Sequence, residues 1–529
     1  GIGNFGGETD NWQWPRHTGD FSFLRAYVSK EGKPVPYSKD NVPYRPKHFL
    51  KVSPKGASPG DLIFVAGYPG RTARLSPYAE VREIVEWTLP RSIKRATDLI
   101  AILESVSKDD QETELRVAQS IRGLNNGLTK NKGVLQGMVK GGLLAKKKAQ
   151  EEAFVAWIDT DPARRAKYGD VLPAINQIIA ERTTSRERDA LLAEFSGSRS
   201  GLAAAQMLYR FSIEKPKQDA DRDADYQERN WSRLKDGQER AQRTLSPKAD
   251  RAVMKYVLAD IAKLPAGQRI EPLDQAIGLA PDMPEAEAAT VCDAWLEKLY
   301  AGTKVYDRDF RMSLFDKSTA EIVATQDALI TLAAALFPLQ EANREKLKEL
   351  TGSNYRLGPR FAEALLAKSG GLVSPDANST LRVTFGTVKG VEPRDGMVYL
   401  PQTTLNGILE KATGSGEFNA PQAQLDAIKA VLAGRPTPFL DPKLKDVPVN
   451  FLSNVDTTGG NSGSATLNSR GELVGLLFDG TFDTVASDYL FDQVKTRSIH
   501  VDSRNLLWVM TEVDKATNLL EEMGFPAEQ

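Results

Sequence analysis

The feature that most constrains the fold of this chain is a change of hydrophobic period near residue 79 and a second change near residue 375. Between these points, apolar residues recur at i, i+3, i+4 and i+7, the pattern of amphipathic helices. On both sides of that block, short apolar runs end at glycine and proline, which is typical of β-strands. With 529 residues, the chain exceeds what one hydrophobic core can hold. We therefore expect an α+β protein in which a β domain carries a large all-α insertion.

The expected elements can be placed along the chain with approximate bounds. The strand-like runs are 21–28, 61–67, 381–385, 447–452 and 472–478. The segments with helical period, rich in strong helix formers, are 80–105, 111–150, 199–214, 249–264, 317–337 and 340–351. The predicted domains are the first part of a β domain over 1–78, a helical domain over 79–378 and the second part of the β domain over 379–529.

Composition excludes several classes of protein. Lys plus Arg (69) and Asp plus Glu (70) nearly cancel, so no net field favours nucleic acid or an anionic membrane. The charges of 214–254 have both signs and indicate a solvated helical face. No run approaches the roughly 18 apolar residues of a membrane span. One cysteine and three scattered histidines, without H-E-x-x-H, argue against a disulfide framework, a metal site or another bound cofactor.

The most informative segment reads T-T-G-G-N-S-G-S over 457–464. A serine hydroxyl needs a base and a site for the developing oxyanion, and flanking glycines let successive amides point into one cavity. We therefore interpret Ser462 as a nucleophile and the amides of Gly460 and Ser462 as its oxyanion hole. The alternative is a Gly/Ser/Asn hairpin turn without chemistry. Apolar strand runs on both sides favour the functional interpretation.

A second dense cluster reads D-N-W-Q-W-P-R-H-T-G-D-F-S over 10–22. Asp20 precedes a predicted strand and is suited to orient an imidazole. We do not interpret His17 as the base, because chymotrypsin-like chains place the histidine far before the aspartate. We expect His17 to be structural and hydrogen-bonded near the carboxylate, and His48 and His500 to be ordinary half-buried or surface residues.

Together these residues resemble the bacterial dipeptidyl-peptidase 7 and 11 family of serine exopeptidases, and the sequence is closer to the dipeptidyl-peptidase 7 type. The motifs are spread over both β regions, and their spacing is coherent over the whole chain. They are N-W-x-W-P-R-H-T-G-D-F-S (11–22), G-Y-P-G-R-T (67–72), T-T-G-G-N-S-G-S (457–464), G-E-L-V-G-L-x-F-D (471–479) and R-S-I-x-V-D-x-R (497–504).

The resemblance implies a chymotrypsin-like double β-barrel with an inserted helical domain that caps the cleft. It implies Ser462 as nucleophile and Asp20 as the triad aspartate. The triad histidine of the family lies upstream of the matching motif, in a stretch absent here. We therefore expect the barrel to be truncated at its N-terminus, and this polypeptide alone to be inactive.

The resemblance also implies the substrate: oligopeptides with a free N-terminus, from which dipeptides are released. The α-ammonium group would be held by Asn11, Trp12 and an asparagine of the helical domain, assigned to Asn126 although Asn125 is adjacent. Carbonyl acceptors and an aromatic face suit a cation. Family members are periplasmic or outer-surface enzymes and commonly homodimers, so we expect both properties here.

The preference for the second substrate residue, P1, follows from Gly480. Acid-selective family members carry an arginine at the matching position, eighteen residues after the nucleophile. A glycine supplies no counter-charge, so an acidic side chain would be buried unpaired. We therefore expect an aliphatic or aromatic P1 residue.

Two other interpretations stay open at this stage. An endopeptidase on the same double barrel would share the triad but lack the ammonium clamp, and would cut substrates with a blocked N-terminus. A non-catalytic, peptide-binding relative would lack the histidine altogether.

Overall fold

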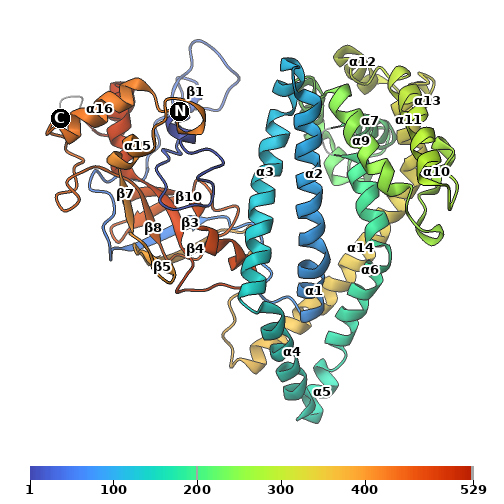
Figure 1. The fold of residues 1–529 in the computed structure, drawn as a ribbon, viewed down its shortest axis with the longest axis horizontal. Helices are drawn as coiled ribbons and strands as arrows, with labels where there is room; N and C mark the ends of the chain where they lie inside the picture. Colours follow the sequence, from blue (N-terminus) through green and yellow to red (C-terminus); the bar gives the residue numbers. More distant parts are fainter. Residues whose placement is uncertain (198–199, 526–529) are drawn as a thin grey trace. The chain divides into compact units, whose positions relative to one another are not determined.

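The computed structural model describes residues 1–197 and 200–525, and these form two compact units. The β unit comprises residues 1–76, 129–146 and 374–529, and the helical unit comprises 77–128 and 147–373. Figure 1 shows that the β unit combines segments from both ends of the chain. The helical unit is formed by the middle of the chain, except that residues 129–146 belong to the β unit.

A seven-stranded antiparallel sheet is the centre of the β unit. Its strands in spatial order are β4 (Arg382–Thr387), β3 (Leu62–Gly67), β9 (Ala465–Asn468), β10 (Leu473–Gly480), β11 (Ser498–Asp502), β8 (Pro448–Ser453) and β7 (Gln402–Thr404). Two further strand pairs are β1 (Tyr27–Val28) with β2 (Val42–Pro43), and β5 (Val391–Arg394) with β6 (Met397–Tyr399). The order places β3, from the N-terminal region, between two strands from the C-terminal region.

Four of the five predicted strand runs form strands β3, β4, β8 and β10 of this sheet. The exception is 21–28, of which only Tyr27–Val28 pairs with another strand. The prediction of a strand over 21–26 was wrong. An alternating apolar pattern indicates that the backbone can be extended. The segment becomes a β-strand only if an adjacent strand offers free backbone hydrogen-bonding groups.

Short helices cover the sheet of the β unit. They are α15 (Leu405–Lys411), α16 (Gln422–Leu432), α17 (Ser503–Trp508) and α18 (Thr517–Glu522), with a π turn over Val509–Val513. Leu405, Ile428 and Trp508 are fully buried members of the apolar cluster that these helices form. The short 3-10 helix η9 (Phe482–Asp488) follows β10 directly and packs beside the functional site described below.

The core of the β unit is polar where β11 crosses it. His500 is fully buried, with its ring nitrogens 2.7 Å from Ser453 Oγ and 2.8 Å from Thr466 Oγ1. Its ring stacks on Phe451 with centroids 4.6 Å apart. The prediction that His500 is half-buried or at the surface was therefore wrong. Its hydrogen-bond partners come from β8 and β9, which no local pattern around position 500 reveals.

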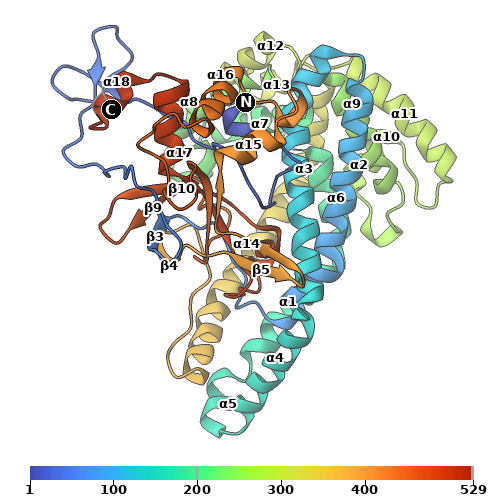
Figure 2. The same cartoon turned by 60° about the vertical axis from the view of Figure 1, so that its left-hand side comes forward.

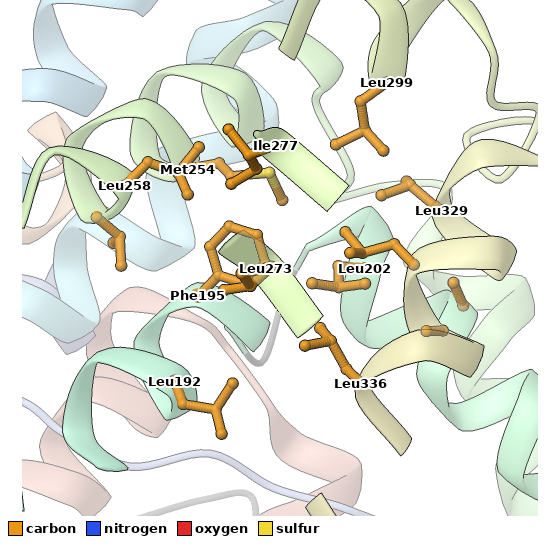
Figure 3. Close-up of a cluster of buried hydrophobic side chains, with 14 of the residues drawn as sticks. Leu192, Phe195, Leu202, Met254, Leu258, Leu273, Ile277, Leu299, Leu329 and Leu336 are labelled. Atoms are coloured by element: carbon orange, nitrogen blue, oxygen red, sulfur yellow. The ribbon is translucent and has the colours of Figure 1, made fainter. Parts of the chain in front are cut away.

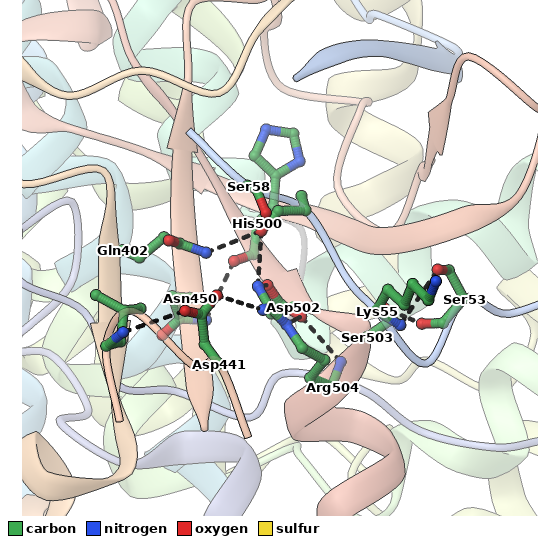
Figure 4. Close-up of polar contacts among 12 residues, drawn as sticks. Ser53, Lys55, Ser58, Gln402, Asp441, Asn450, His500, Asp502, Ser503 and Arg504 are labelled. Carbon is green, nitrogen blue, oxygen red and sulfur yellow. Dashed lines mark hydrogen bonds and ion pairs between the residues drawn. The ribbon is translucent and has the colours of Figure 1, made fainter. Parts of the chain in front are cut away.

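A buried ion network continues from the end of β11 (Figure 4). Asp502 accepts two hydrogen bonds from the Arg504 guanidinium, at 3.0 and 2.8 Å. The same guanidinium donates to Asp441 at 2.9 Å and to the carbonyl of Ala57 at 2.6 Å. Asp502 is completely inaccessible to solvent. The network therefore joins three segments of the chain, and Arg504 lies 63 residues from Asp441 and 447 residues from Ala57.

The helical unit is built from helices of very different lengths. They are α1 (Tyr78–Glu83), α2 (Leu89–Ser107), the first part of α3 (Gln111–Lys140), α4 (Leu143–Asp159), α5 (Pro162–Tyr168), α6 (Val171–Ser196), α7 (Gly201–Glu214), α8 (Trp231–Ala241), α9 (Pro247–Ile261), α10 (Glu271–Ile277), α11 (Glu285–Ala301), α12 (Arg308–Ser313), α13 (Thr319–Val323) and α14 (Ala328–Lys368). A π turn (Ile84–Thr88) joins α1 to α2.

Apolar packing holds this unit together. Figure 3 shows Leu202, Leu258 and Leu336, all fully buried, converging with leucine, phenylalanine and methionine side chains from neighbouring helices. Figure 2 shows α4 and α5 at one end of this unit. A second cluster, to which α4, α5 and α14 contribute, contains Phe154 and Tyr168. The interior thus follows the i, i+3, i+4 pattern read from the sequence.

The predicted helices exist, but two of their bounds differ. The segment predicted over 111–150 breaks at Gly141 and Gly142, where Gly142 has a φ of 62°, and becomes α3 and α4. The segments 317–337 and 340–351 instead form α13 and the long α14, which continues through Pro338. Periodicity locates helical stretches, whereas the breaks depend on single residues and their neighbours.

The α+β class with a large helical region and antiparallel sheets is confirmed. Closure of the sheet into a double barrel stays a prediction. Within residues 1–197 and 200–525, no helix is both long and apolar enough to cross a membrane. The same described residues contain no group of three or more His, Cys, Asp or Glu side chains arranged to hold a metal ion.

Candidate active site

Ser462 lies in the turn between β8 and β9, and its side chain is exposed. Its Oγ is 3.5 Å from the carbonyl oxygen of Phe478 in β10. The register between β10 and β11 shifts from Leu477 to Asp479, so Phe478 occupies a β-bulge. Bulges commonly redirect groups beside active sites. The predicted nucleophile therefore borders the irregular end of β10 and is open to solvent.

The turn before Ser462 requires glycine at position 460. Gly460 has a φ of 105°, and a Cβ there would lie 2.4 Å from the carbonyl oxygen of Tyr68 and 2.6 Å from the amide of Gly70. The amides of Gly460 and Ser462 donate to no protein atom in the part of the chain that the structure describes. Both amides are therefore available to a ligand, and their role as an oxyanion hole stays a prediction.

The loop that carries Ser462 is tied to the end of β3. The amide of Gly70 donates to the carbonyl of Gly459 at 2.7 Å. Within the loop, Thr458 and Asn461 exchange two hydrogen bonds: the Asn461 amide donates to the Thr458 carbonyl at 3.0 Å, and the Thr458 amide donates to Asn461 Oδ1 at 3.1 Å. The motif G-Y-P-G-R-T thus supports the motif T-T-G-G-N-S-G-S directly.

Asp20, the predicted triad aspartate, follows the buried Thr18 and Gly19. Its carboxylate makes no hydrogen bond or ion pair with the residues that the structure describes. Partial burial raises the pKa of Asp20, and the positive charge of Arg16 opposes that shift. The structure therefore places no imidazole beside Asp20, and its role stays a prediction.

Among the described residues, none of the three histidines is hydrogen-bonded to Ser462. His17 is buried against Gly407, and its Nδ1 atom has no hydrogen-bond partner, so the predicted hydrogen bond to a carboxylate is not found at that atom. Burial lowers the pKa of His17 to about 3, and the positive charge of Lys411 contributes to this decrease. Burial also lowers the pKa of His500 to about 3. His48 lies exposed in a loop.

The predicted ammonium-binding segment meets the end of β10. The amide of Trp12 donates to Asp479 Oδ2 at 3.3 Å, and Arg16 forms a 2.8 Å ion pair with the same oxygen. Asn11 donates to Glu8 at 3.1 Å. Trp12 has a φ of 59°, an uncommon conformation for a residue with a side chain. The segment is therefore held in a defined shape over Asp479.

Asp479 is the residue that sequence reasoning missed. Burial raises its pKa, while Arg16 and the amides of Gly480 and Trp12 lower it. It lies directly after Phe478, whose carbonyl contacts Ser462. A carboxylate at this position supplies negative charge next to the Asn11–Trp12 segment. The sequence feature that could have identified Asp479 is its place as the last residue of the motif G-E-L-V-G-L-x-F-D.

Comparison with known proteins places the whole chain in one family. The family model described as Peptidase S46 matches residues 1–525. The chain belongs to the peptidase S46 family. A 35% identical relative is an Asp/Glu-specific dipeptidyl-peptidase of Shewanella putrefaciens; the match covers 99% of this chain and 72% of the relative. A dipeptidyl-peptidase 7 of Porphyromonas gingivalis is 30% identical, with 99% and 71% covered.

Solved S46 structures share the fold. DPP11 of Porphyromonas endodontalis in complex with the dipeptide Arg-Glu aligns with a TM-score of 0.79 and 28% identity, over 99% of this chain and 73% of that one. The same protein in complex with Arg-Asp aligns with a TM-score of 0.78 and 27% identity, over 100% and 73%. This chain is accordingly a serine dipeptidyl-peptidase of the S46 family.

Gly480 ends β10 in this S46 member. A Cβ there would lie 3.2 Å from Thr484 Cγ2 and 3.5 Å from the carbonyl of Arg497. The Arg497 guanidinium donates to the carbonyls of Gly390, Gln493 and Thr496, at 3.0, 3.3 and 2.6 Å. Arg497 is thus engaged by carbonyl oxygens, and Arg16 is engaged by Asp479.

The fold brings together Ser462, Gly480 and Trp12 at the end of β10. Asn126 is exposed on the part of α3 that belongs to the helical unit, and the adjacent Asn125 is half-buried. Asn126 stays a predicted member of the site.

Proposed function

We propose that this S46 peptidase removes dipeptides from the free N-termini of oligopeptides, with Ser462 as nucleophile and an apolar P1 residue preferred. The observation that carries the proposal is the junction at the end of β10. There, an exposed serine with two unengaged amides lies close to the buried carboxylate of Asp479, which accepts a hydrogen bond from the Trp12 amide. We propose that the Asn11–Trp12 segment next to Asp479 holds the α-ammonium group of the substrate.

In the proposed mechanism, Ser462 Oγ attacks the carbonyl carbon of the second residue. The carbonyl oxygen becomes an oxyanion that the amides of Gly460 and Ser462 stabilise. A general base accepts the hydroxyl proton and later donates it to the leaving amine. Water then hydrolyses the acyl-enzyme and releases the dipeptide.

The base is a separate proposal. His17 and His500 are buried and neutral, and His48 is an exposed loop residue, so none of the three is placed to activate Ser462. We propose that the imidazole comes from residues outside these 529, and that Asp20 orients it. Asp20 supports this assignment because its carboxylate has no described partner of its own.

The experiment compares this 529-residue polypeptide with a longer form expressed from the gene extended upstream of Gly1. The substrates are dipeptidyl arylamides with either a free or an acetylated N-terminus. We expect hydrolysis of the free substrates by the extended product and none of the acetylated ones. Cleavage of the acetylated substrates would indicate an endopeptidase. Dipeptide binding without hydrolysis by either form would indicate a non-catalytic peptide-binding relative.

The P1 preference is supported by the surroundings of Gly480. Gly480 supplies no counter-charge to an acidic P1 side chain, and Arg16 and Arg497 are already paired with other groups. We expect kcat/KM for Leu or Phe at P1 to exceed that for Asp or Glu by at least about tenfold. Gly480→Arg should raise hydrolysis of acidic substrates, whereas the control Gly480→Ala should not. Preference of the unaltered enzyme for Asp or Glu would refute the proposal.

Homodimer formation and a periplasmic location stay predictions from the family resemblance.

A further inference from the structure

A chain of three polar side chains links helix α3 to the loop that carries the nucleophile. Lys130 Nζ on α3 lies 3.1 Å from Asp488 Oδ2 at the end of η9. Asp488 Oδ1 accepts a hydrogen bond from the Thr458 hydroxyl. The Asp488 side chain is only 14% exposed, so solvent screens this ion pair less than one at the surface.

Thr458 opens the turn that forms the proposed oxyanion hole. Its backbone exchanges two hydrogen bonds with Asn461. Gly459 and Gly460 therefore lie between two residues that are hydrogen-bonded to each other. Lys130 Nζ is 4.0 Å from the position that a Cβ would take on Gly459. A displacement of Thr458 would therefore move the Gly460 amide.

Asp488 is itself held from the opposite side. Its carbonyl accepts a hydrogen bond from the Ala73 amide at 2.8 Å, and the carbonyl of Ser487 accepts one from Arg74 Nε at 2.8 Å. Arg74 also forms a two-point ion pair with Asp456, at 2.5 and 2.8 Å. The loop from 456 to 458 is thus anchored through the side chains of Asp456 and Thr458.

Glycines on α3 allow the close approach that this link requires. A Cβ on Gly133 would lie 2.9 Å from the Phe482 ring, and a Cβ on Gly137 would lie 2.6 Å from Ala486 Cβ. Both glycines share a helix face with Lys130, at spacings of three and seven residues. Because α3 packs closely on η9, the distance between Lys130 and Asp488 depends on this packing.

We propose that Lys130, Asp488 and Thr458 form a positioning relay that couples the placement of α3 to the geometry of the oxyanion hole. The proposal rests on the proposed function. Asn126 precedes Lys130 by one helical turn on the same face of α3. Binding of a substrate ammonium group to that face would place Lys130, and through Asp488 and Thr458 it would place the Gly460 amide. A free N-terminus would then increase kcat and not only affinity.

The test uses Lys130→Met, Asp488→Asn and Thr458→Val in the gene product that hydrolyses dipeptidyl arylamides. Each variant should lower kcat about 10- to 100-fold, because a displaced oxyanion donor loses most of its contribution. KM and the affinity for a dipeptide product, measured by calorimetry, should change less than about threefold. Lys130→Arg and Thr458→Ser should restore most of kcat. The double variant Lys130→Met/Asp488→Asn should lose less than the product of the single losses.

Lys132→Met is the matched control, since Lys132 is an exposed lysine on the same helix with no ion pair in the described residues. It should leave kcat unchanged. Values of kcat within about twofold of wild type for all three relay variants would overturn the proposal. So would a rise in KM at constant kcat.

A second measurement separates this proposal from the proposed function. Hydrogen exchange of the 456–462 amides should be faster in Asp488→Asn than in wild type, and unchanged in Lys132→Met. If wild type hydrolyses no dipeptidyl substrate, the proposed function fails while the exchange data still test the anchoring of the loop. Unchanged exchange in Asp488→Asn would overturn the relay whatever the activity.

Discussion

The interiors of the two units are stabilised in different ways. In the helical unit, Leu202, Leu258 and Leu336 belong to a large apolar cluster. In the β unit, β11 is buried along its length and includes His500 and Asp502. Apolar packing tolerates rearrangement, whereas buried polar groups each need a partner in a set direction. Around β11, the interior of the β unit therefore depends on the direction of hydrogen bonds, whereas the leucine cluster of the helical unit does not.

Titratable groups reinforce this contrast. All three histidines lie in the β unit, and the helical unit has none. Burial lowers the pKa of both His17 and His500 to about 3. Acid should therefore act on the two units differently. Four substitutions test this difference between the two units.

The largest effect should come from Ser462→Ala, which removes the nucleophile without altering either interior. We expect kcat/KM of the active gene product to fall at least about 10⁴-fold, as for removal of a serine nucleophile in other peptidases. The unfolding midpoint should not change, because the side chain is exposed. Residual activity within tenfold of wild type would show that another residue is the nucleophile.

Asp502→Ala should be the most destabilising change in the β unit. It leaves the Arg504 guanidinium buried, with Asp441 as its remaining carboxylate partner. Removing one partner of a buried ion pair costs about 3–5 kcal/mol. Hydrogen exchange should show faster opening of β10 and β11 and unchanged protection in α9 and α14. Equal loss of protection in both units would mean that they unfold together.

Leu258→Ala tests the apolar interior of the helical unit. Leu258 is fully buried in α9, and such truncations cost about 2–5 kcal/mol. Denaturant unfolding followed by exchange should place the loss in the helical unit. The exposed ion pair between Lys167 and Glu363 supplies the control, and Glu363→Gln should produce no measurable change. Loss of protection in β11 would contradict the separation of the two interiors.

The smallest effect is the pH dependence of stability. The folded pKa of His500 lies below its unfolded value, so its neutral form favours folding above about pH 6.5, and that contribution is lost as pH falls toward 3. The loss is about 1.4 kcal/mol per pH unit for each such histidine. Burial raises the pKa of Asp479 and Asp502, which acts in the opposite direction. A variant without the imidazole isolates the histidine contribution.

We therefore expect the difference in unfolding free energy between wild type and His500→Gln to shrink by about 2 kcal/mol from pH 7 to pH 5. Urea unfolding at several pH values measures this difference. A constant difference would show that His500 is protonated equally in the folded and unfolded states.

Local patterns predicted most of the fold. The strands β3, β4, β8 and β10 and the main helices follow from periodicity, because which face of an element is buried repeats along the chain. The predictions that were wrong concern residues whose structure depends on segments far away in the sequence. The run 21–26 has no strand beside it, and His500 finds its partners on β8 and β9.

The sequence by itself determined that a β region flanks a helical block and that Ser462 lies in a glycine turn. Both depend on local requirements: hydrophobic period, and a backbone conformation at Gly460 that a side chain would obstruct. Only the tertiary structure placed Asp479 under Trp12 and Lys130 beside Asp488. These contacts join residues hundreds of positions apart, and they depend on strand register, on the bulge at Phe478 and on how closely α3 packs.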